Sequence, residues 1–403
     1  MLRSLFSGIS GLRVHQTMMD VTGNNISNVN TAGFKTSQSV FEDTLSQMLK
    51  AAGAPQNGAG GTNPAQVGLG VRLAGINTNF TQGGTQNTGR TTDLMINGDG
   101  FFVVRNGGEA MYTRSGAFNF DATGILAGPG GAVVQGWMAD PTGAINTNAA
   151  VGDVKLAVGT LLAPTNTDNM TLGGNLPADS TTAGTTPITM SETVYDAQGN
   201  KVQLSVSFTK LSATSWSVTA TDGTTPTAAT TINFAADGSG PPAPTSISYT
   251  NAAFTAPGIA IDLTKLTSYA GASSVGIQSQ NGSGIGSLQS FTISPDGTLV
   301  GVFSNGKKQA LAQIAMATFN NPPGLEKTGG SMYRSTVNSG LAQLGTAGTG
   351  GRGGLQGSSL EMSNVDLAQE FTNLIIAQRG FQANTKVIST SDELLNDLVN
   401  LKR

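Results

Sequence analysis

The sequence predicts a mainly β fold with α-helical ends: the N- and C-terminal helices pair as a coiled coil, and two nested β domains lie between them. Apolar residues recur at alternating spacings of three and four at both ends of the chain. Across the middle they alternate with polar residues in short runs bounded by turn residues. The composition agrees, because 55 glycines and a charged fraction of only 11 % in 403 residues suit turn-rich β structure.

The N-terminal helix is expected over about residues 4–28. Its apolar stripe follows a heptad rhythm that Gln16 and Gly23 interrupt. The stripe consists of Leu5, Ile9, Leu12, Met19 and Ile26.

The C-terminal helix is expected to begin after residues 363–366, where Ser363 offers an N-cap and Asp366 places an acid in the first turn. Polar residues at Gln378, Thr385 and Asp392 interrupt its stripe. The stripe consists of Leu367, Phe371, Leu374, Phe381, Ile388 and Leu395.

Neither helix can bury its stripe alone. Pairing the two helices with each other is the simplest solution, and it would make the whole middle of the chain an out-and-back excursion. The alternative is that each helix packs on a separate domain.

Residues 202–208 and 216–220 alternate apolar and polar side chains, which is typical of half-buried strands. Further strand and turn patterns occur at 101–120 and 291–319. Stretches poor in apolar residues indicate joints between these units: 51–66, expected to be a flexible loop or extended arm, 165–187, 222–244 and 345–357.

The composition argues against several classes of site. The chain has no cysteine and a single histidine, His15, expected on a solvent-facing or subunit-facing side of its helix, so thiol and most histidine chemistry is missing. The glycines around Gly68 do not fit a dinucleotide fingerprint. A net charge of −3 without a basic block offers nothing to attract nucleic acid. We therefore expect no enzyme, no cofactor, no metal site, no nucleic acid and no membrane insertion.

Short motifs at both ends of the chain resemble those of the flagellar rod and hook protein family. The motifs are SGISGL at 7–12, GNNISN at 23–28, TAGFK at 31–35, VGLGV at 67–71, FTQG at 80–83, NTGR at 87–90, GDGFF at 98–102, LGTAG at 344–348, LEMSNVDL at 360–367 and AQRGFQAN at 377–384. They occupy residues 1–125 and 285–403, whereas residues 163–278 carry no comparable motif.

The resemblance implies a division of the chain into nested units. These are a terminal helical coiled-coil domain (1–28 plus 365–403), a connecting region (29–70 plus 345–364), an inner β domain (71–162 plus 279–344) and an outer β domain (163–278). Because rod subunits have a short middle, the extra outer domain favours a hook subunit.

As a hook subunit, the chain would polymerise through its helical stripes into a curved, flexible tube that transmits torque from the motor rod to the filament. The implied partners are further copies of itself, the distal rod protein, the hook cap protein, the hook–filament junction protein and the flagellar export apparatus. The implied location is extracellular, in the flagellar hook and basal body, after export without a cleaved signal peptide. Two alternatives stay open. Residues 51–66 resemble an insertion found in distal rod proteins, and the β-rich middle would also suit a secreted adhesin or tail-fibre-like protein.

Overall fold

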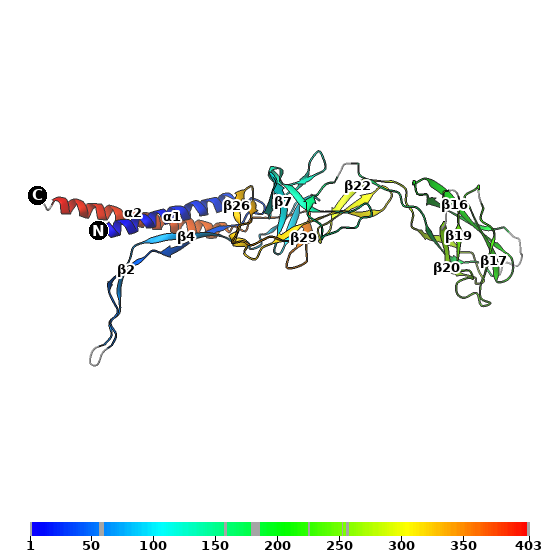
Figure 1. Ribbon diagram of the computed structural model, residues 1–403, viewed down its shortest axis with the longest axis horizontal. Helices are drawn as coiled ribbons and strands as arrows, with labels where there is room; N and C mark the ends of the chain where they lie inside the picture. Colours follow the sequence, from blue (N-terminus) through cyan, green and yellow to red (C-terminus); the bar gives the residue numbers. More distant parts are fainter. Residues whose placement is uncertain are drawn as a thin grey trace.

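The computed structural model describes residues 2–55, 60–156, 159–178, 186–224, 226–251, 253–254 and 258–400. Its elements are strung along one long axis, with both chain termini at the helical end and the outer β sheets at the other (Figure 1). The mainly β fold with helical ends is confirmed, and the excursion between the two helices runs out and back as the sequence predicts.

Two long helices form the terminal pair, α1 (Leu2–Ser27) and α2 (Leu367–Asn400). The side chain of Asp366 caps α2, because its Oδ1 accepts hydrogen bonds from the backbone N–H groups of Ala368 at 2.9 Å and Gln369 at 3.3 Å. The cap is therefore Asp366 and not Ser363, and Glu370 is the acid in the first turn.

A hairpin of β1 (Ser37–Asp43) and β4 (Val71–Thr78) packs along α1. A second hairpin, β2 (Ser46–Lys50) and β3 (Ala65–Gly68), leaves the long axis as a projecting arm (Figure 1). The expected loop or arm at 51–66 is the outer part of this hairpin, and residues 56–59 lie outside the described residues.

The inner β region is built on one large sheet with two short 3-10 turns, η1 (Pro129–Gly131) and η2 (Pro322–Gly324). The sheet runs β13 (Leu161–Leu162), β22 (Gly286–Ile293), β23 (Thr298–Phe303), β24 (Lys308–Ile314), β11 (Val133–Met138), β7 (Phe101–Asn106), β8 (Glu109–Thr113), β27 (Met332–Arg334), β26 (Glu326–Gly329), with β9 (Asn119–Phe120), β10 (Leu126–Ala127), β12 (Gly152–Asp153), β25 (Met316–Thr318) and β28 (Gln343–Gly345) beside this path. Two small pairs connect it to the helical end: β6 (Leu94–Asn97) with β29 (Gly354–Gly357), and β5 (Thr85–Asn87) with β30 (Ser359–Glu361).

The outer β region contains two four-stranded sheets around their own core. One runs β19 (Ser246–Tyr249), β20 (Ile259–Thr267), β14 (Asn169–Asn175), β21 (Gly276–Gln280), and the other β15 (Ile188–Tyr195), β16 (Lys201–Lys210), β17 (Ser215–Thr221), β18 (Thr230–Asn233). The chain enters through β14 and leaves through β21, and these two strands pair antiparallel. Entry and exit therefore lie side by side.

Most strands expected from alternation are confirmed, including β16, in which Leu204, Val206 and Phe208 are buried and the residues between them are not. Beyond the arm, the expectation of joints was wrong, because the other stretches interpreted in that way contain strands with buried apolar side chains. The stretch 165–187 contains β14, whose Met170 and Leu172 are fully buried in the outer core. The stretch 222–244 contains β18 with Ile232 fully buried, and 345–357 contains β29 with Leu355 buried. Two alternating apolar residues among glycines and polar residues suffice for a strand when both neighbouring strands pair with it.

Candidate assembly interface

The contact between α1 and α2 is made by small and polar side chains. A Cβ atom on Gly11 would lie 2.6 Å from Oδ1 of Asn384, and one on Gly380 would lie 2.4 Å from Cε1 of His15. Real Cβ atoms essentially never come this close to another heavy atom, so with any other residue at either position the Asn384 or His15 side chain would have to move.

On α2 the face toward α1 repeats every seven residues. Its members, Glu370, Ala377, Asn384 and Ser391, are buried or half-buried. Where the start of α1 meets the end of α2, Ser391 Oγ lies 3.4 Å from the Oγ of Ser4. The paired helices thus follow the heptad geometry of a coiled coil with a mostly small, polar seam.

The predicted stripes lie beside this seam and are only partly covered. Leu374, Phe381, Ile388 and Leu395 of α2 are half-buried, as are Leu5, Ile9, Leu12, Met19 and Ile26 of α1. Leu367 and Phe371 are 40 % and 50 % exposed. The large apolar side chains therefore do not form the main contact between the two helices, and their role in contacts between subunits stays a prediction.

The position of His15 corrects an expectation. Its ring packs against Gly380 of α2 and makes an edge contact with Phe41 of β1, with the ring centroids 6.3 Å apart. Within the described residues its buried Nδ1 atom has no hydrogen-bond partner. His15 thus packs in the intrachain seam, and its side chain is half-buried in the single chain.

Asn25 ties the base of the helix pair to the first strand. Its side chain accepts a hydrogen bond from the backbone N–H of Ser37 at 3.0 Å and donates to the carbonyl oxygen of the same residue at 2.8 Å. It also donates to Oε1 of Glu370 on α2 at 3.1 Å. Burial raises the pKa of the Glu370 carboxyl above its ordinary value.

A buried charge cluster lies where the helix pair joins the inner β region. The Glu361 carboxylate accepts a 2.6 Å ion-paired hydrogen bond from Lys35 Nζ, and Arg114 Nη1 lies 3.5 Å from its second oxygen. All three side chains are at most 2 % exposed. Burial lowers the pKa of Lys35, although the neighbouring carboxylate opposes this shift, and burial likewise lowers the pKa of Arg114.

This cluster could not be predicted from the sequence. Lys35 closes the motif at 31–35 and Glu361 lies in the motif at 360–367, so two motifs that are far apart in sequence meet in one ion pair. The sequence shows only a lysine and a glutamate beside apolar residues in two short motifs. Their pairing becomes visible only when the fold brings the two motifs together.

Several apolar side chains remain uncovered at the helical end. On the arm and its base, Leu45, Met48 and Leu49 are 83 %, 58 % and 60 % exposed. On α2 the exposed large apolar residues are Leu367, Phe371, Ile375, Ile376, Val387 and Leu394. Exposed apolar surface of this kind marks contact sites for other molecules.

The described residues hold no group of three or more histidine, cysteine, aspartate or glutamate side chains that could bind a metal ion. Across the same part of the chain, no helix is both long and apolar enough to span a membrane.

An elongated chain whose two ends form one helix pair with uncovered apolar side chains has the architecture of a structural building block. Four family models match it in order: flagella basal body rod protein at 5–35, flagellar hook protein FlgE/F/G D1 domain at 95–173, flagellar basal body protein FlaE D2 domain at 160–283, and flagellar basal body rod FlgEFG protein C-terminal at 356–401. The chain belongs to the flagellar hook protein family, whose members are structural proteins.

Full-length relatives place it within that family. The flagellar hook protein FlgE of Borreliella burgdorferi is 38 % identical, with all of both chains covered, and the FlgE of Escherichia coli is 37 % identical over 98 % of each. The flagellar basal-body rod protein FlgG of Bacillus subtilis is 33 % identical over the full length of both. The hook protein FlgE2 of Helicobacter pylori has a similar fold, with a TM-score of 0.54 and 14 % identity over 69 % of this chain and 100 % of that one.

These matches do not favour the two alternatives left open by the sequence. Identity to the hook relatives named above exceeds identity to the rod relative. An adhesin or tail-fibre origin does not explain similarity that extends over whole hook chains.

Proposed function

We propose that this chain is the repeating subunit of a flagellar hook, a curved and flexible tube that transmits torque from the motor rod to the filament. The observation that carries the proposal is the helix pair, which uses glycines and polar residues for its own contact and leaves its large apolar side chains for other copies. The role assigned to the chain is structural and not enzymatic.

We propose that the chain is divided into four nested structural units, with the boundaries that the sequence indicates. These are the helical domain at 1–28 and 365–403, the connecting region at 29–70 and 345–364, the inner β domain at 71–162 and 279–344, and the outer β domain at 163–278. The division is supported by separate apolar cores, one for the outer sheets and two for the inner sheet.

We assign the contacts between copies to the side chains of the two stripes. They are Leu5, Ile9, Leu12, Met19, Ile26, Leu367, Phe371, Leu374, Phe381, Ile388 and Leu395. Each is exposed or half-buried in the single chain, so each has apolar area left to bury. Burial contributes about 25 cal/mol per Å² of apolar surface, so eleven such residues per copy can supply a large share of the assembly free energy.

The proposed partners are those of a hook. Besides its own copies, the chain would meet the distal rod protein at one end of the tube, and the hook cap and hook–filament junction proteins at the other. The flagellar export apparatus would deliver it to an extracellular position.

Electron microscopy of the purified full-length chain tests the proposal. The chain should form tubes at high concentration, and a chain that stays monomeric at every concentration would refute it. Ile9→Asp and Phe381→Asp should block tube formation, because a charge buried in an apolar contact is costly. Asn24→Asp and Ser389→Asp are the matched controls, since both positions are exposed on the same helices and lie outside the stripes.

A further inference from the structure

The exposed apolar residues of α2 form two separate faces. Face A consists of Leu367, Phe371 and Ile375, and face B consists of Ile376, Val387 and Leu394; all six side chains are between 40 % and 58 % exposed. Successive residues of an α-helix are rotated by about 100°, so face A lies about 60–160° to one side of the seam of Glu370, Ala377, Asn384 and Ser391, and face B about 60–100° to the other side. No other element of the described chain covers either face.

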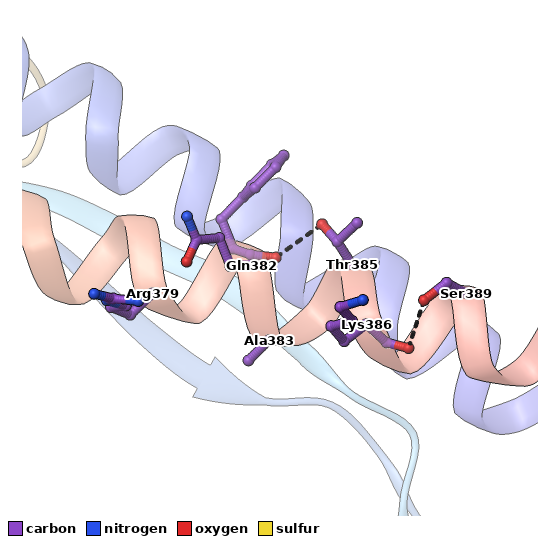
Figure 2. Close-up of a pocket in the computed structure, with 7 residues that line it drawn as sticks. Arg379, Gln382, Ala383, Thr385, Lys386 and Ser389 are labelled. Carbon is purple, nitrogen blue, oxygen red and sulfur yellow. Dashed lines mark hydrogen bonds between the residues drawn. The ribbon is translucent and has the colours of Figure 1, made fainter.

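A charged line separates the two faces on the side of α2 opposite α1. It carries two basic residues, Arg379 and Lys386, followed by the acidic Glu393; Asp397 lies at its edge, at the heptad position of Ile376 in face B. Among the described residues none of the four has an ion-pair partner. Arg379 and Lys386 border an open depression lined by α2 alone, and with Ala383 they lie on the side turned away from α1 (Figure 2).

Two unlike faces on one helix fit a head-to-tail contact between copies. A two-fold contact would need one self-complementary face, whereas a contact that repeats along a polymer needs two different ones. Building on the proposed hook function, we infer that face A of one copy packs against face B of the next, with the α2 helices parallel. In this contact Arg379 and Lys386 of one copy lie beside Glu393 and Asp397 of its neighbour.

The sequence positions fix how far neighbouring copies are offset along the helix axis. The centre of face A lies about 15 residues before the centre of face B, which is about 22 Å at 1.5 Å per residue. The centre of the basic pair lies about 12 residues before that of the acidic pair, or about 19 Å. Two independent features therefore indicate an offset of about 20 Å in the same direction.

An arrangement without an offset fails on both features. It would place Arg379 of one copy at the level of Arg379 of the next, so the like charges would repel. It would also place face A against the polar side chains of Gln369 and Asn373.

Chain-terminating variants test the two faces. Phe371→Asp damages face A only, and Leu394→Asp damages face B only, so each variant can still join a tube through its intact face but cannot be followed. Added to wild-type chains at roughly one in twenty, each should shorten the tubes severalfold in electron micrographs. The double variant, Phe371→Asp with Leu394→Asp, has no intact face and should leave tube length unchanged. If the double variant shortens tubes as much as the single ones, or the single ones co-assemble at normal length, the inference is wrong.

Charge exchange tests the pairing and the offset. A chain with Arg379→Glu and Lys386→Glu has acids at both places, and a chain with Glu393→Lys and Asp397→Lys has bases at both. Each should need about tenfold higher concentration than wild type to form tubes at low salt, and the difference should shrink at high salt. An equimolar mixture should assemble at nearly the wild-type concentration, because every contact can then join opposite charges. A mixture that assembles no better than its components overturns the inference.

Thermal unfolding of each monomeric variant, followed by tryptophan fluorescence, should match wild type and so show that the β domains remain folded. Wild-type chains that form no tubes would refute the hook proposal itself. Wild-type tubes combined with the negative outcomes above refute only the arrangement of faces.

Discussion

Glu361 should be among the residues on which the stability of the inner β domain depends most. Its carboxylate lies 2.6 Å from Lys35 Nζ and 3.5 Å from Arg114 Nη1, and it accepts a hydrogen bond from the backbone N–H of Gly83 at 3.0 Å. Replacing it by alanine would leave two buried cations without their counter-charge and one buried N–H without its acceptor.

The loss of unfolding free energy expected for Glu361→Ala can be estimated from these unpaired groups. Breaking a buried ion pair by removing one partner costs about 3–5 kcal/mol, since the other charge stays buried and uncompensated. Lys35→Met is the instructive comparison. It leaves Glu361 beside Arg114, so the site becomes neutral overall, whereas Glu361→Ala leaves it with two positive charges. Lys35→Met should therefore cost clearly less, about 1–2 kcal/mol, chiefly from the hydrogen bond that Lys35 donates to the carbonyl oxygen of Thr81.

Tryptophan fluorescence during urea unfolding can measure both values. Trp137 is 4 % exposed in the inner core, so a Trp216→Phe background reports on the inner β domain without a signal from the outer one. We expect the unfolding midpoint to fall strongly for Glu361→Ala and slightly for Lys35→Met. A loss below about 1 kcal/mol for Glu361→Ala, or an equal loss for Lys35→Met, would refute the assignment of this cluster as a charge-balanced joint.

Three further predictions concern the helix pair and the outer domain. Gly380→Ala should prevent close pairing and abolish tubes, because the new methyl would collide with His15, and adding His15→Ala should restore them in electron micrographs. Replacing residues 163–278 by a short Gly-Ser linker should leave tube formation intact, because the entry and exit strands are adjacent and the outer core is separate. The shortened chains should form straighter hooks and weaken swimming in a motility assay. Failure of the remnant to fold would show that the boundaries cut a shared core. Because the pKa of Glu370 is raised in the folded helix pair, this carboxyl keeps its proton above pH 4.5, and stability falls as pH rises from 4.5 through the raised pKa. Glu370→Gln should remove this fall in the thermal midpoint measured by the helical circular dichroism signal. A pH profile that the substitution leaves unchanged would contradict the prediction.

The sequence predicted the helices and most strands well, because both depend on local periodicity. The alternation at 202–208 reappears as β16 with its apolar side chains buried. Leu374, Phe381, Ile388 and Leu395 are half-buried beside the helix contact, whereas their spacing predicted them at its centre. Local patterns of this kind are sufficient wherever one face of an element is buried by apolar residues.

The centre of the helix contact could not be predicted in that way. It consists of glycines, serines, asparagines and one histidine, which a search for apolar stripes ignores. Their importance comes from close backbone approach and from hydrogen bonds such as that between Asn25 and Glu370, which are properties of two segments some 345 residues apart. The Lys35–Glu361 pair was missed for the same reason, since neither residue is unusual until the other is placed beside it.

The out-and-back path also determines when a newly delivered copy can be added to its polymer. The helix that begins the chain finds its partner only in the last residues, so a chain that arrives with its N-terminus first carries an unmatched α1 until nearly everything else has emerged. An isolated helix is marginal in water, and α1 contains three glycines, so it gains little order before α2 arrives. A copy can therefore join the tube only when its last residues have arrived and α2 has paired with α1. A truncated copy lacks α2 and cannot occupy a place in the growing structure.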